Sequence, residues 1–409
     1  MKKKLFVLTI FITLTLAFPA CNLITIEIDK GGSSEDQVIA IQEDQTSTVQ
    51  QQTETSSYSL PKYILVDTGD EESLTYVDLQ GQTIAVMQTP GIGYGSSSKV
   101  HVAGSSTLGV NNIPLIYHSF ANPESLLVNS NNSISPLVNT PMFYGLAGAP
   151  GEAIIAYSVY EPTSESVHSD LYLGTLETLP TTGPIYSTDD KDSYRVMNPL
   201  AISTESGIAT GIWYTFSAWG IGGDIIFPVN QSLFYFDMTS GNNYEFIGDS
   251  CNVQGLSQDF TWAACRGSAS DGSPTYTIEN FVSGNSVSFP LDPSSDRGAG
   301  YGTFSPDDMY VAWLEASGSN MAEVPNYHSR IRIGMTSGGI IYDQDDTALS
   351  QALGVGTIPY MQPVGWLDTH NVLVEAYLDN YLIASLIRIN IADGSVTKIA
   401  EGAFVAFVY

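Results

Sequence analysis

From Tyr63 to Tyr409 the chain is built of short runs in which apolar and β-branched residues alternate with polar ones, separated by Gly, Asn and Asp. Alternation over about four to eight residues is typical of a half-buried β-strand. No stretch of helical length repeats its apolar residues at the helical spacing. The pattern therefore predicts an all-β domain.

Two units recur along this region. The first is a hairpin whose turn ends in Gly, and the second is a short motif that precedes such hairpins. Copies of the second unit follow one another at about 50 residues, and four strands in each such period are typical of a β-propeller blade. The hairpins span 74–81, 233–241, 276–284, 330–338 and 387–394, and the second unit begins at Leu146, Ile202, Leu256, Phe304 and Trp366.

The most complete copy of the second unit reads Phe304-Ser305-Pro306-Asp307-Asp308, followed by Val311-Ala312-Trp313. It resembles the aromatic-Ser-Pro-Asp-Gly and apolar-Ala-aromatic signature of TolB-type, WD-repeat-like β-propellers. Asp308 stands where that family has Gly. The resemblance implies a propeller over about 63–409. It implies little about activity, because such propellers serve both as binding scaffolds and as gating domains of peptidases.

Counting the units predicts seven four-stranded blades, with six or eight as alternatives because segment 92–139 is weakly marked. Residues 63–89 supply only three strands. The apolar run Ala403–Tyr409 is therefore expected to join this N-terminal blade as its fourth strand and close the ring, which leaves no long open edge. The complete blades are expected at 92–139, 142–188, 194–248, 250–290, 298–347 and 358–402.

The N-terminus predicts a bacterial lipoprotein. A basic start precedes the apolar run Leu5–Phe18, which is too short to span a bilayer and is typical of a signal peptide. The segment Leu16-Ala17-Phe18-Pro19-Ala20-Cys21 resembles a lipobox, which implies lipid attachment at Cys21. Phe18 replaces the usual Leu, so plain secretion remains the alternative. The expected domains are a signal peptide at 1–20, an acidic Ser/Thr/Gln-rich tether at 21–60 and the propeller at 61–409.

Two further cysteines, Cys251 and Cys265, are predicted to form a disulfide. If the chain turns at 257–259, they lie opposite each other on neighbouring antiparallel strands. A disulfide indicates an oxidising compartment and therefore agrees with export. Two buried free thiols are the alternative, because a bridge between adjacent strands is geometrically demanding.

Charge excludes one class of partner. The chain has 14 Lys and Arg against 43 Asp and Glu, a net charge of -29, and no basic stripe beyond its first four residues. Such a protein repels phosphate backbones, so nucleic-acid binding is excluded. Residues 61–409 hold 10 basic and 36 acidic side chains, a net charge of -26. This domain is expected to favour cations or basic partners, and salt should weaken that attraction.

Catalytic and metal-binding motifs are not found. The sequence lacks the Gly-x-Ser-x-Gly motif of the hydrolase domain that peptidase relatives carry, which excludes a hydrolase of that type. The five histidines, His101, His118, His168, His328 and His370, show no metal-ligand spacing. The Asp runs lack the pattern of a calcium loop, so calcium is the less favoured alternative to no cofactor. No catalytic residue or metal ligand is predicted.

One face of the propeller is predicted to bind a ligand. The longest loops are expected between second and third strands, and they share a face with Asp-rich connectors that lead to the next blade. Functional loops on a rigid scaffold are common, and exposed aromatic residues can anchor a partner. The alternative is that these residues cap the core and the acids are solvated turns. The expected binding-face residues are Tyr160, Trp219, Ile221, Asp224, Tyr327 and His328, and the expected acidic connectors include Asp189, Asp190, Asp192, Asp343, Asp345 and Asp346.

These features favour a non-catalytic, lipid-anchored, extracytoplasmic propeller that acts as a binding scaffold for a protein, peptide or glycan at the bacterial cell surface. The alternative is a propeller-type carbohydrate-active enzyme, a glycoside hydrolase or lyase, that uses carboxylates in its central funnel.

Overall fold

The computed structural model describes most of the chain from Leu60 onward. This part is dominated by strands, and it contains one α-helix, α2 (Asp346–Leu353). None of its helices is long and apolar enough to cross a membrane. The described residues are 60–70, 72–92, 100–119, 122–131, 133–140, 142–163, 165–179, 183–190, 195–218, 230–268, 273–318, 327–378 and 384–409.

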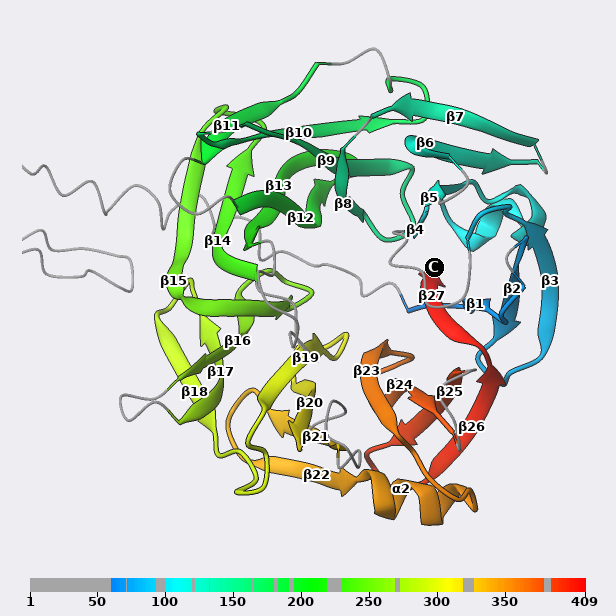
Figure 1. Cartoon of the computed structure of the whole chain (residues 1–409), viewed down its shortest axis with the longest axis vertical. Helices are drawn as coiled ribbons and strands as arrows, with labels where there is room; N and C mark the ends of the chain where they lie inside the picture. Colours follow the sequence, from blue (N-terminus) through cyan, green and yellow to red (C-terminus); the bar gives the residue numbers. More distant parts are fainter. Residues whose placement is uncertain are drawn as a thin grey trace, which may run out of the picture. The chain divides into compact units, whose positions relative to one another are not determined.

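The strands form antiparallel sheets arranged in a ring, with one edge strand of each sheet near the centre and the other on the rim (Figure 1). This is a β-propeller, as the sequence predicted. Five sheets have four strands each. They are β27 (Ala403–Val408), β1 (Tyr63–Asp67), β2 (Ser73–Asp78) and β3 (Thr83–Gln88); β4 (Val100–Val102), β5 (Leu115–Ser119), β6 (Asn122–Ser130) and β7 (Ser133–Asn139); β8 (Phe143–Gly148), β9 (Ile154–Pro162), β10 (Val167–Thr175) and β11 (Tyr186–Asp190); β19 (Gly298–Phe304), β20 (Tyr310–Ser317), β21 (His328–Met335) and β22 (Ile340–Asp345); and β23 (Tyr360–Trp366), β24 (Asn371–Tyr377), β25 (Ala384–Asn390) and β26 (Val396–Glu401).

The remaining strands form one seven-stranded sheet. It consists of β12 (Arg195–Glu205), β13 (Ile208–Ala218), β14 (Asn230–Asp237), β15 (Asn243–Leu256), β16 (Trp262–Ser268), β17 (Pro274–Asn280) and β18 (Asn285–Phe289). Within β15, residues 243–247 pair with β14 and residues 253–256 pair with β16, while Asn252 pairs with both. The prediction of seven separate four-stranded blades is therefore corrected to five, plus this sheet. The expected boundary near 249 fails because the backbone stays extended there and no Pro ends the strand.

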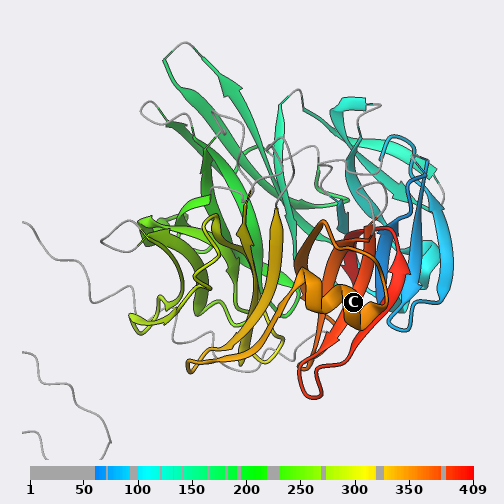
Figure 2. The same cartoon turned by 60° about the horizontal axis from the view of Figure 1, so that its bottom comes forward.

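The ends of the described chain meet in one sheet. β27 pairs antiparallel with β1, so that Ile64 lies opposite Phe407 and Leu65 opposite Ala406. In Figures 1 and 2 the red strand β27 lies beside the blue strand β1. The predicted closure by the C-terminal strand is confirmed. It supplies the first blade with an inner strand, which residues 63–89 alone do not provide.

Two 3₁₀ turns and the helix complete the elements. The turns η2 (Ser106–Leu108) and η3 (Val110–Asn112) lie between β4 and β5, and the Ser106 N–H donates a hydrogen bond to the Tyr409 carbonyl oxygen. Helix α2 follows β22 directly and contacts β26 on the rim (Figure 2). The Asp345 side chain caps it by accepting a hydrogen bond from the Ala348 N–H at 2.8 Å.

The core lies between neighbouring sheets and fixes their inner strands. Trp313 is fully buried on β20 and stacks on Tyr276 of β17, with ring centroids 4.9 Å apart. Such aromatic pairs add about 0.5 to 1.5 kcal/mol to the stabilisation from burial alone. Gly255 of β15 and Gly302 of β19 bring two backbones together, because a Cβ on Gly255 would lie 2.1 Å from the Gly302 carbonyl oxygen. Strands β15 and β19 of adjacent sheets therefore touch.

In the turn Ser305–Asp308, which carries the Ser-Pro-Asp motif, Asp308 stands in the place of the usual Gly and contacts a second turn. Its backbone has a positive φ of 55°, which Asp tolerates better than most residues. Its carboxylate accepts hydrogen bonds from the N–H groups of Gln258 at 2.7 Å and Asp259 at 3.0 Å. Burial raises the pKa of Asp308 to about 7. The side chain thus joins its own turn to the turn between β15 and β16.

Candidate functional site

The structure places two predicted binding-face tyrosines at the same end of their sheets. Tyr160 lies near the end of β9 and Tyr327 directly precedes β21, so both stand where a second strand passes to a third. The register brings the start of the first strands to this end as well, since Phe143 of β8 pairs with Val159. We call this end the mouth and define it by Tyr144, Tyr160, Tyr301, Tyr327, Tyr360 and Tyr377. Trp219, Ile221 and Asp224 lie outside the described residues.

Each of the two predicted tyrosines packs against a tyrosine of an inner strand. Tyr160 contacts Tyr144 of β8 edge-to-face, with ring centroids 6.0 Å apart. Tyr327 stacks on Tyr360 of β23 at 6.0 Å, and Tyr360 contacts Tyr377 at 6.1 Å. All of these side chains are partly exposed. Sequence reasoning found the loop members and missed Tyr144 and Tyr360, although a Tyr at the start of a first strand is a readable signal.

Tyr301 is held in a strained conformation on the inner strand β19. Its φ is +57°, and the register of β19 shifts between Gly300 and Thr303, which marks a β-bulge. The Tyr301 N–H donates to Oε1 of Gln254 on β15 at 3.0 Å. A bulky residue at positive φ costs about 1 to 3 kcal/mol, and bulges often re-aim a side chain near a functional site. Tyr301 is thus a strained residue within the mouth.

A chain of hydrogen bonds leads from Tyr301 to a buried acid. The Tyr301 and Tyr360 side chains are hydrogen-bonded, and the Tyr360 hydroxyl donates to Gln362 Oε1 at 2.9 Å. Gln362 Nε2 donates to Glu375 Oε1 at 3.4 Å, and the Phe404 N–H donates to Glu375 Oε2 at 2.7 Å. The chain thereby connects β19, β23, β24 and β27.

Burial controls the charge of these groups. Glu375 is 7% exposed, and burial raises its pKa although both of its hydrogen bonds lower it. Burial also raises the pKa of Tyr301 and of Tyr360, and the nearby Glu375 charge acts in the same direction. The phenols therefore stay un-ionised over the physiological pH range. The mouth combines uncharged aromatic rings, amide groups and one buried carboxyl group.

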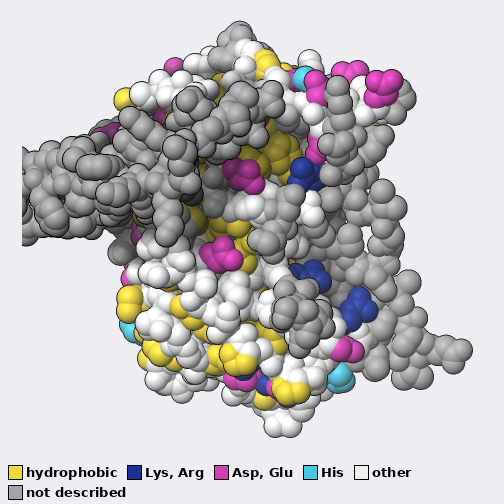
Figure 3. Space-filling model, turned by 90° about the vertical axis from the view of Figure 1, so that its left-hand side faces the viewer, with side chains coloured by type: hydrophobic (Ala, Val, Ile, Leu, Met, Phe, Trp, Pro, Cys, Tyr) yellow, Lys and Arg dark blue, Asp and Glu magenta, His cyan; other side chains and the backbone are white. Residues whose placement is uncertain are grey.

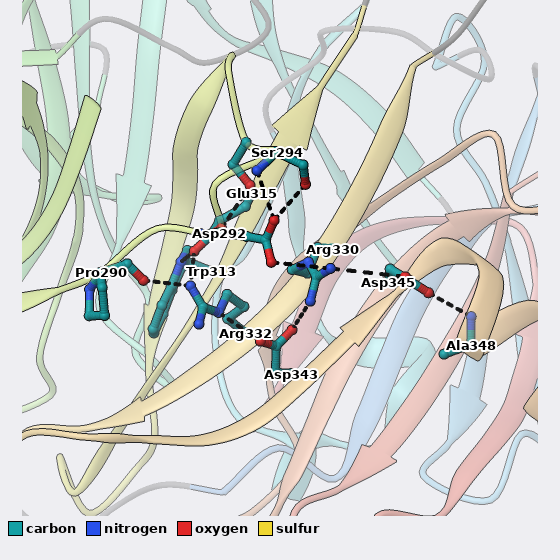
Figure 4. A network of polar contacts seen from close by, with 11 residues as sticks. Pro290, Asp292, Ser294, Trp313, Glu315, Arg330, Arg332, Asp343, Asp345 and Ala348 are labelled. Atoms are coloured by element: carbon teal, nitrogen blue, oxygen red, sulfur yellow. Dashed lines mark hydrogen bonds and ion pairs between the residues drawn. The ribbon is translucent and has the colours of Figure 1, made fainter. Parts of the chain in front are cut away.

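The predicted acidic connectors lie at strand ends and carry basic partners. Asp343 lies within the rim strand β22 and pairs with Arg330 and, through Oδ2 at 3.3 Å from Nε, with Arg332 (Figure 4). Arg330 Nη2 also lies 3.4 Å from Asp292 Oδ2 and 4.0 Å from Asp345 Oδ2. Three carboxylates thus surround one guanidinium group. The prediction that Asp343 and Asp345 lie in a loop between blades is wrong, because both belong to strand β22.

Two more of the predicted acids also lie beside basic side chains. Asp189 and Asp190 end β11, where Asp189 lies 2.9 Å from His168 Nδ1 and Asp190 lies 3.0 Å from Arg195 Nε. The hydrogen bond that His168 donates to Asp189 raises the pKa of His168. Figure 3 shows acidic and basic side chains together on one side of the molecule. Asp192 lies outside the described residues.

His328 belongs to a contact of this kind. Its Nδ1 lies 3.1 Å from Oδ2 of Asp346, the first residue of α2, and the same oxygen accepts a hydrogen bond from the Ser329 N–H at 3.1 Å. The predicted residues His328 and Asp346 therefore meet, but at the rim side of the sheet. They tie β21 to the start of α2.

Glu315 is the most deeply buried acid of this region, and both of its carboxylate oxygens accept hydrogen bonds. It accepts hydrogen bonds from Arg332 Nη1 at 2.8 Å, Trp313 Nε1 at 3.0 Å, the Asp292 N–H at 2.8 Å and the Ser295 hydroxyl at 2.8 Å (Figure 4). Four donors leave its carboxylate no capacity for a ligand. Glu315 therefore stabilises the scaffold behind the mouth.

Two further predictions concern Cys and metal sites. Cys251 and Cys265 form the predicted disulfide, with their Cα atoms 5.2 Å apart, across β15 and β16. In the described ranges, no group of three or more His, Cys, Asp or Glu side chains is arranged to hold a metal ion.

Comparison with known proteins places the fold. No protein-family model and no curated protein matches the chain. Among solved structures, TolB from Acinetobacter baumannii shares 13% identity over 70% of this chain and 63% of its own, with a TM-score of 0.41. A putative TolB from Agrobacterium tumefaciens shares 15% identity over 70% of this chain and 90% of its own, with a TM-score of 0.38.

A prolyl endopeptidase structure has a TM-score of 0.52 and shares 9% identity over 86% of this chain and 51% of its own length. The chain thus spans about half of that protein and less than two thirds of the first TolB structure. Similarity at this level of identity concerns the fold alone. It agrees with the β-propeller that the strand order defines.

Proposed function

We propose that this protein is a non-catalytic, lipid-anchored, extracytoplasmic β-propeller that binds a protein, peptide or glycan through the mouth. One observation carries the proposal. Partly exposed tyrosines from inner strands and from second-to-third strand turns pair at the mouth, and Tyr301 among them is held at positive φ. Backbone strain persists only where the surrounding structure enforces it, and it concentrates at functional sites. Aromatic side chains are the usual anchors of a bound partner.

The disulfide supports the proposed extracytoplasmic location. A disulfide is stable in oxidising surroundings outside the cytoplasm, where a protein with a signal peptide would reside. Lipid attachment at Cys21 has a direct test, which is metabolic labelling with a fatty-acid analogue. The wild-type chain should carry the label and partition into detergent, and Cys21→Ser should do neither. Equal labelling of both chains would refute the anchor.

We also propose that the seven-stranded sheet fills two blade positions of the ring. Its strand β15 pairs with β14 through one half and with β16 through the other, which supports one shared strand rather than one wide blade. A density map of the ring from electron microscopy would count the blade positions. Seven positions would agree with this proposal and six would contradict it.

Binding through the mouth can be tested by capture from envelope extracts with identification of what is bound. The wild-type chain, Tyr327→Ala and the control Tyr172→Ala would be compared, because Tyr172 stacks on Tyr157 of the neighbouring strand at 4.8 Å, in a different sheet from the one that Tyr327 precedes. The same protein, peptide or glycan should be retained by the wild-type chain and the control and be lost from Tyr327→Ala. Equal retention by all three would discard the mouth as the binding face.

A carbohydrate-active enzyme is the second candidate, and Glu375 is the observation that favours it. A carboxyl group whose pKa is raised by burial is suited to general acid catalysis, and this one lies next to the mouth. The test is activity of the purified protein on a panel of oligosaccharides and polysaccharides. Activity that Glu375→Gln abolishes would establish this candidate, and a wild-type chain without any activity would reject it.

A further inference from the structure

We propose that the rim strand β3 is a second binding surface, separate from the mouth, which takes a basic peptide in extended conformation as an added strand. β3 is the last strand of its sheet and lies on the outside of the ring (Figure 1). Among the described strands it pairs with β2 alone. A strand at the end of a sheet presents a row of backbone N–H and C=O groups to which a further strand can bind.

The register shows which backbone groups of β3 face its open edge. Residues opposite each other in an antiparallel pair alternate between hydrogen-bonded and non-hydrogen-bonded pairs. The Thr89 N–H donates to the Glu72 carbonyl oxygen at 2.7 Å, which makes these two residues a hydrogen-bonded pair. Gln88, Met87 and Val86 continue in the same register with β2. The backbone groups of Met87 therefore face β2, and those of Val86 and Gln88 face the open edge.

The side chains of β3 divide between core and surface. Ala85 and Met87 pack into the core cluster that this sheet shares with the next one. The 3₁₀ turn η3 contacts β3 from this core side, since its Val110 belongs to the same cluster. Ile84 and Val86 are 44% and 54% exposed. Both are β-branched, the type that packs well against a neighbouring strand. β3 thus offers an added strand both backbone groups and apolar side chains.

The other rim strands carry features that prevent such pairing. Natural sheets protect their edges with Pro, with charged side chains, by keeping the edge strand short, or with a covering helix. β3 has neither Pro nor a charged residue. β18 is short and largely polar, and α2 contacts both β22 and β26. The protecting residues of the remaining rim strands are Pro136 in β7, Asp189 and Asp190 in β11, Asp343 and Asp345 in β22, and Lys398 and Glu401 in β26.

Charge around β3 favours a basic peptide. Residues 60–89, which include β1, β2 and β3, hold one Lys against five Asp and Glu. Glu72 and Asp78 stand at the two ends of β2, beside the ends of β3. Lys398 on the rim strand β26 is paired with Glu401 at 2.7 Å. A second copy of this chain would bring another domain with a net charge of -26, so the occupant is a peptide that carries Lys or Arg, and salt should weaken its binding.

The chemistry of the occupant is tested by selection. A phage-displayed library of random peptides about ten residues long, enough for one strand, would be selected on the full-length protein. We expect enriched sequences in which apolar residues alternate with Lys or Arg. The best of them, made as a fluorescent peptide, should bind saturably in fluorescence anisotropy, and replacing its Lys and Arg by Glu should weaken binding about ten-fold or more. No enrichment, or enrichment of sequences without this alternation, would overturn the proposal.

Variants locate the peptide on β3. Val86→Pro removes an outward N–H that β2 does not use, and edge strands tolerate Pro at such positions. It should weaken peptide binding about ten-fold or more. Val86→Lys places a charge of the peptide's own sign at the edge and should have the same effect, which provides a second variant in case Val86→Pro fails to fold. The control is Ile208→Lys, because Ile208 is 70% exposed in another sheet, and it should bind as the wild-type chain does. Unchanged binding by the folded Val86 variants would refute the β3 surface.

A last comparison separates this surface from the mouth. Tyr327→Ala should bind the selected peptide as the wild-type chain does, because Tyr327 directly precedes β21 in a different sheet. Loss of the peptide from Tyr327→Ala with retention by Val86→Pro would place the peptide at the mouth and discard the β3 surface. Capture of a partner through Tyr327 does not depend on Val86, so failure of the β3 surface leaves the proposed function of the mouth standing.

Discussion

The disulfide between Cys251 and Cys265 offers the most quantitative test of the scaffold. It lies where β15 changes its pairing partner from β14 to β16, and both side chains are buried in the same core cluster as Trp213 and Leu233. The double variant Cys251→Ala, Cys265→Ala removes the bond without leaving a free thiol. We expect this variant to fold and to be measurably less stable than the wild-type chain.

The size of the effect follows from the loop that the bond closes. The two cysteines are 14 residues apart. The loop-closure model gives about 3 kcal/mol for a loop of roughly 15 residues at 25 °C. A folded part of about 350 residues has an unfolding entropy of about 0.7 kcal/mol/K, so this loss lowers the melting temperature by about 4 °C.

Differential scanning calorimetry measures this shift in melting temperature, and both chains are also measured in the presence of a reducing agent. The reduced wild-type chain should melt near the double variant, and reducing agent should leave the double variant unchanged. A double variant that melts within about 1 °C of the oxidised wild-type chain would refute the reasoning. A reducing agent that lowers both melting temperatures equally would show that it acts elsewhere.

Three further predictions concern single contacts. Arg332→Met leaves the carboxylate of Glu315 buried without its cation and should cost about 3 to 5 kcal/mol in urea unfolding; a loss under about 1 kcal/mol would contradict this. The raised pKa of Asp308, about 7, means that the folded protein keeps this proton to a higher pH than the unfolded chain, so the contribution of Asp308 to stability declines between about pH 4 and pH 7. Asp308→Asn should remove that decline when melting temperature is followed against pH, and an unchanged profile would exclude Asp308 as its source. Gly255→Ala places a Cβ 2.1 Å from a carbonyl oxygen of β19 and should cost about 1 to 3 kcal/mol, whereas the control Gly183→Ala meets nothing within 4 Å and should be neutral in the same unfolding assay.

The sequence predicted the architecture because propeller blades carry their information locally. Alternating runs, Gly-ended hairpins and the Ser-Pro-Asp turn each specify strands and tight turns within a few residues. The lone apolar run Ala403–Tyr409 predicted closure because an apolar strand without a partner must find an edge. The disulfide was predictable because a turn between Cys251 and Cys265 makes their strands neighbours, although the register places Val253 rather than Cys251 directly opposite Cys265.

The errors came from pairings that a linear pattern does not record. Nothing in residues 243–256 shows that one strand serves two partners, because both halves alternate correctly. The acids of β22 were predicted to lie in a loop, yet they belong to a strand whose hairpin register brings Arg332 opposite Asp343 and Arg330 opposite Asp345. The hairpin turn at Gly338 would have revealed these cross-strand pairs.

The candidate site was only half predictable. Tyr160 and Tyr327 were found because enlarged turns are expected to bind partners. Their inner-strand partners Tyr144 and Tyr360 depend on which side chains face the same end of the ring, and Tyr301 depends on a bulge. The direction in which a side chain faces and the position of a bulge are properties of the assembled sheets rather than of the sequence alone.

The central claim is that the mouth is where this protein meets its partner. Site-specific photo-crosslinking in living cells tests it most directly, with a photoreactive residue placed at position 327 and, as a control, at position 172. Such a residue captures protein, peptide and glycan alike. The account predicts a defined adduct from position 327 and none from position 172. An adduct from position 172 alone, or none from either position, would contradict it.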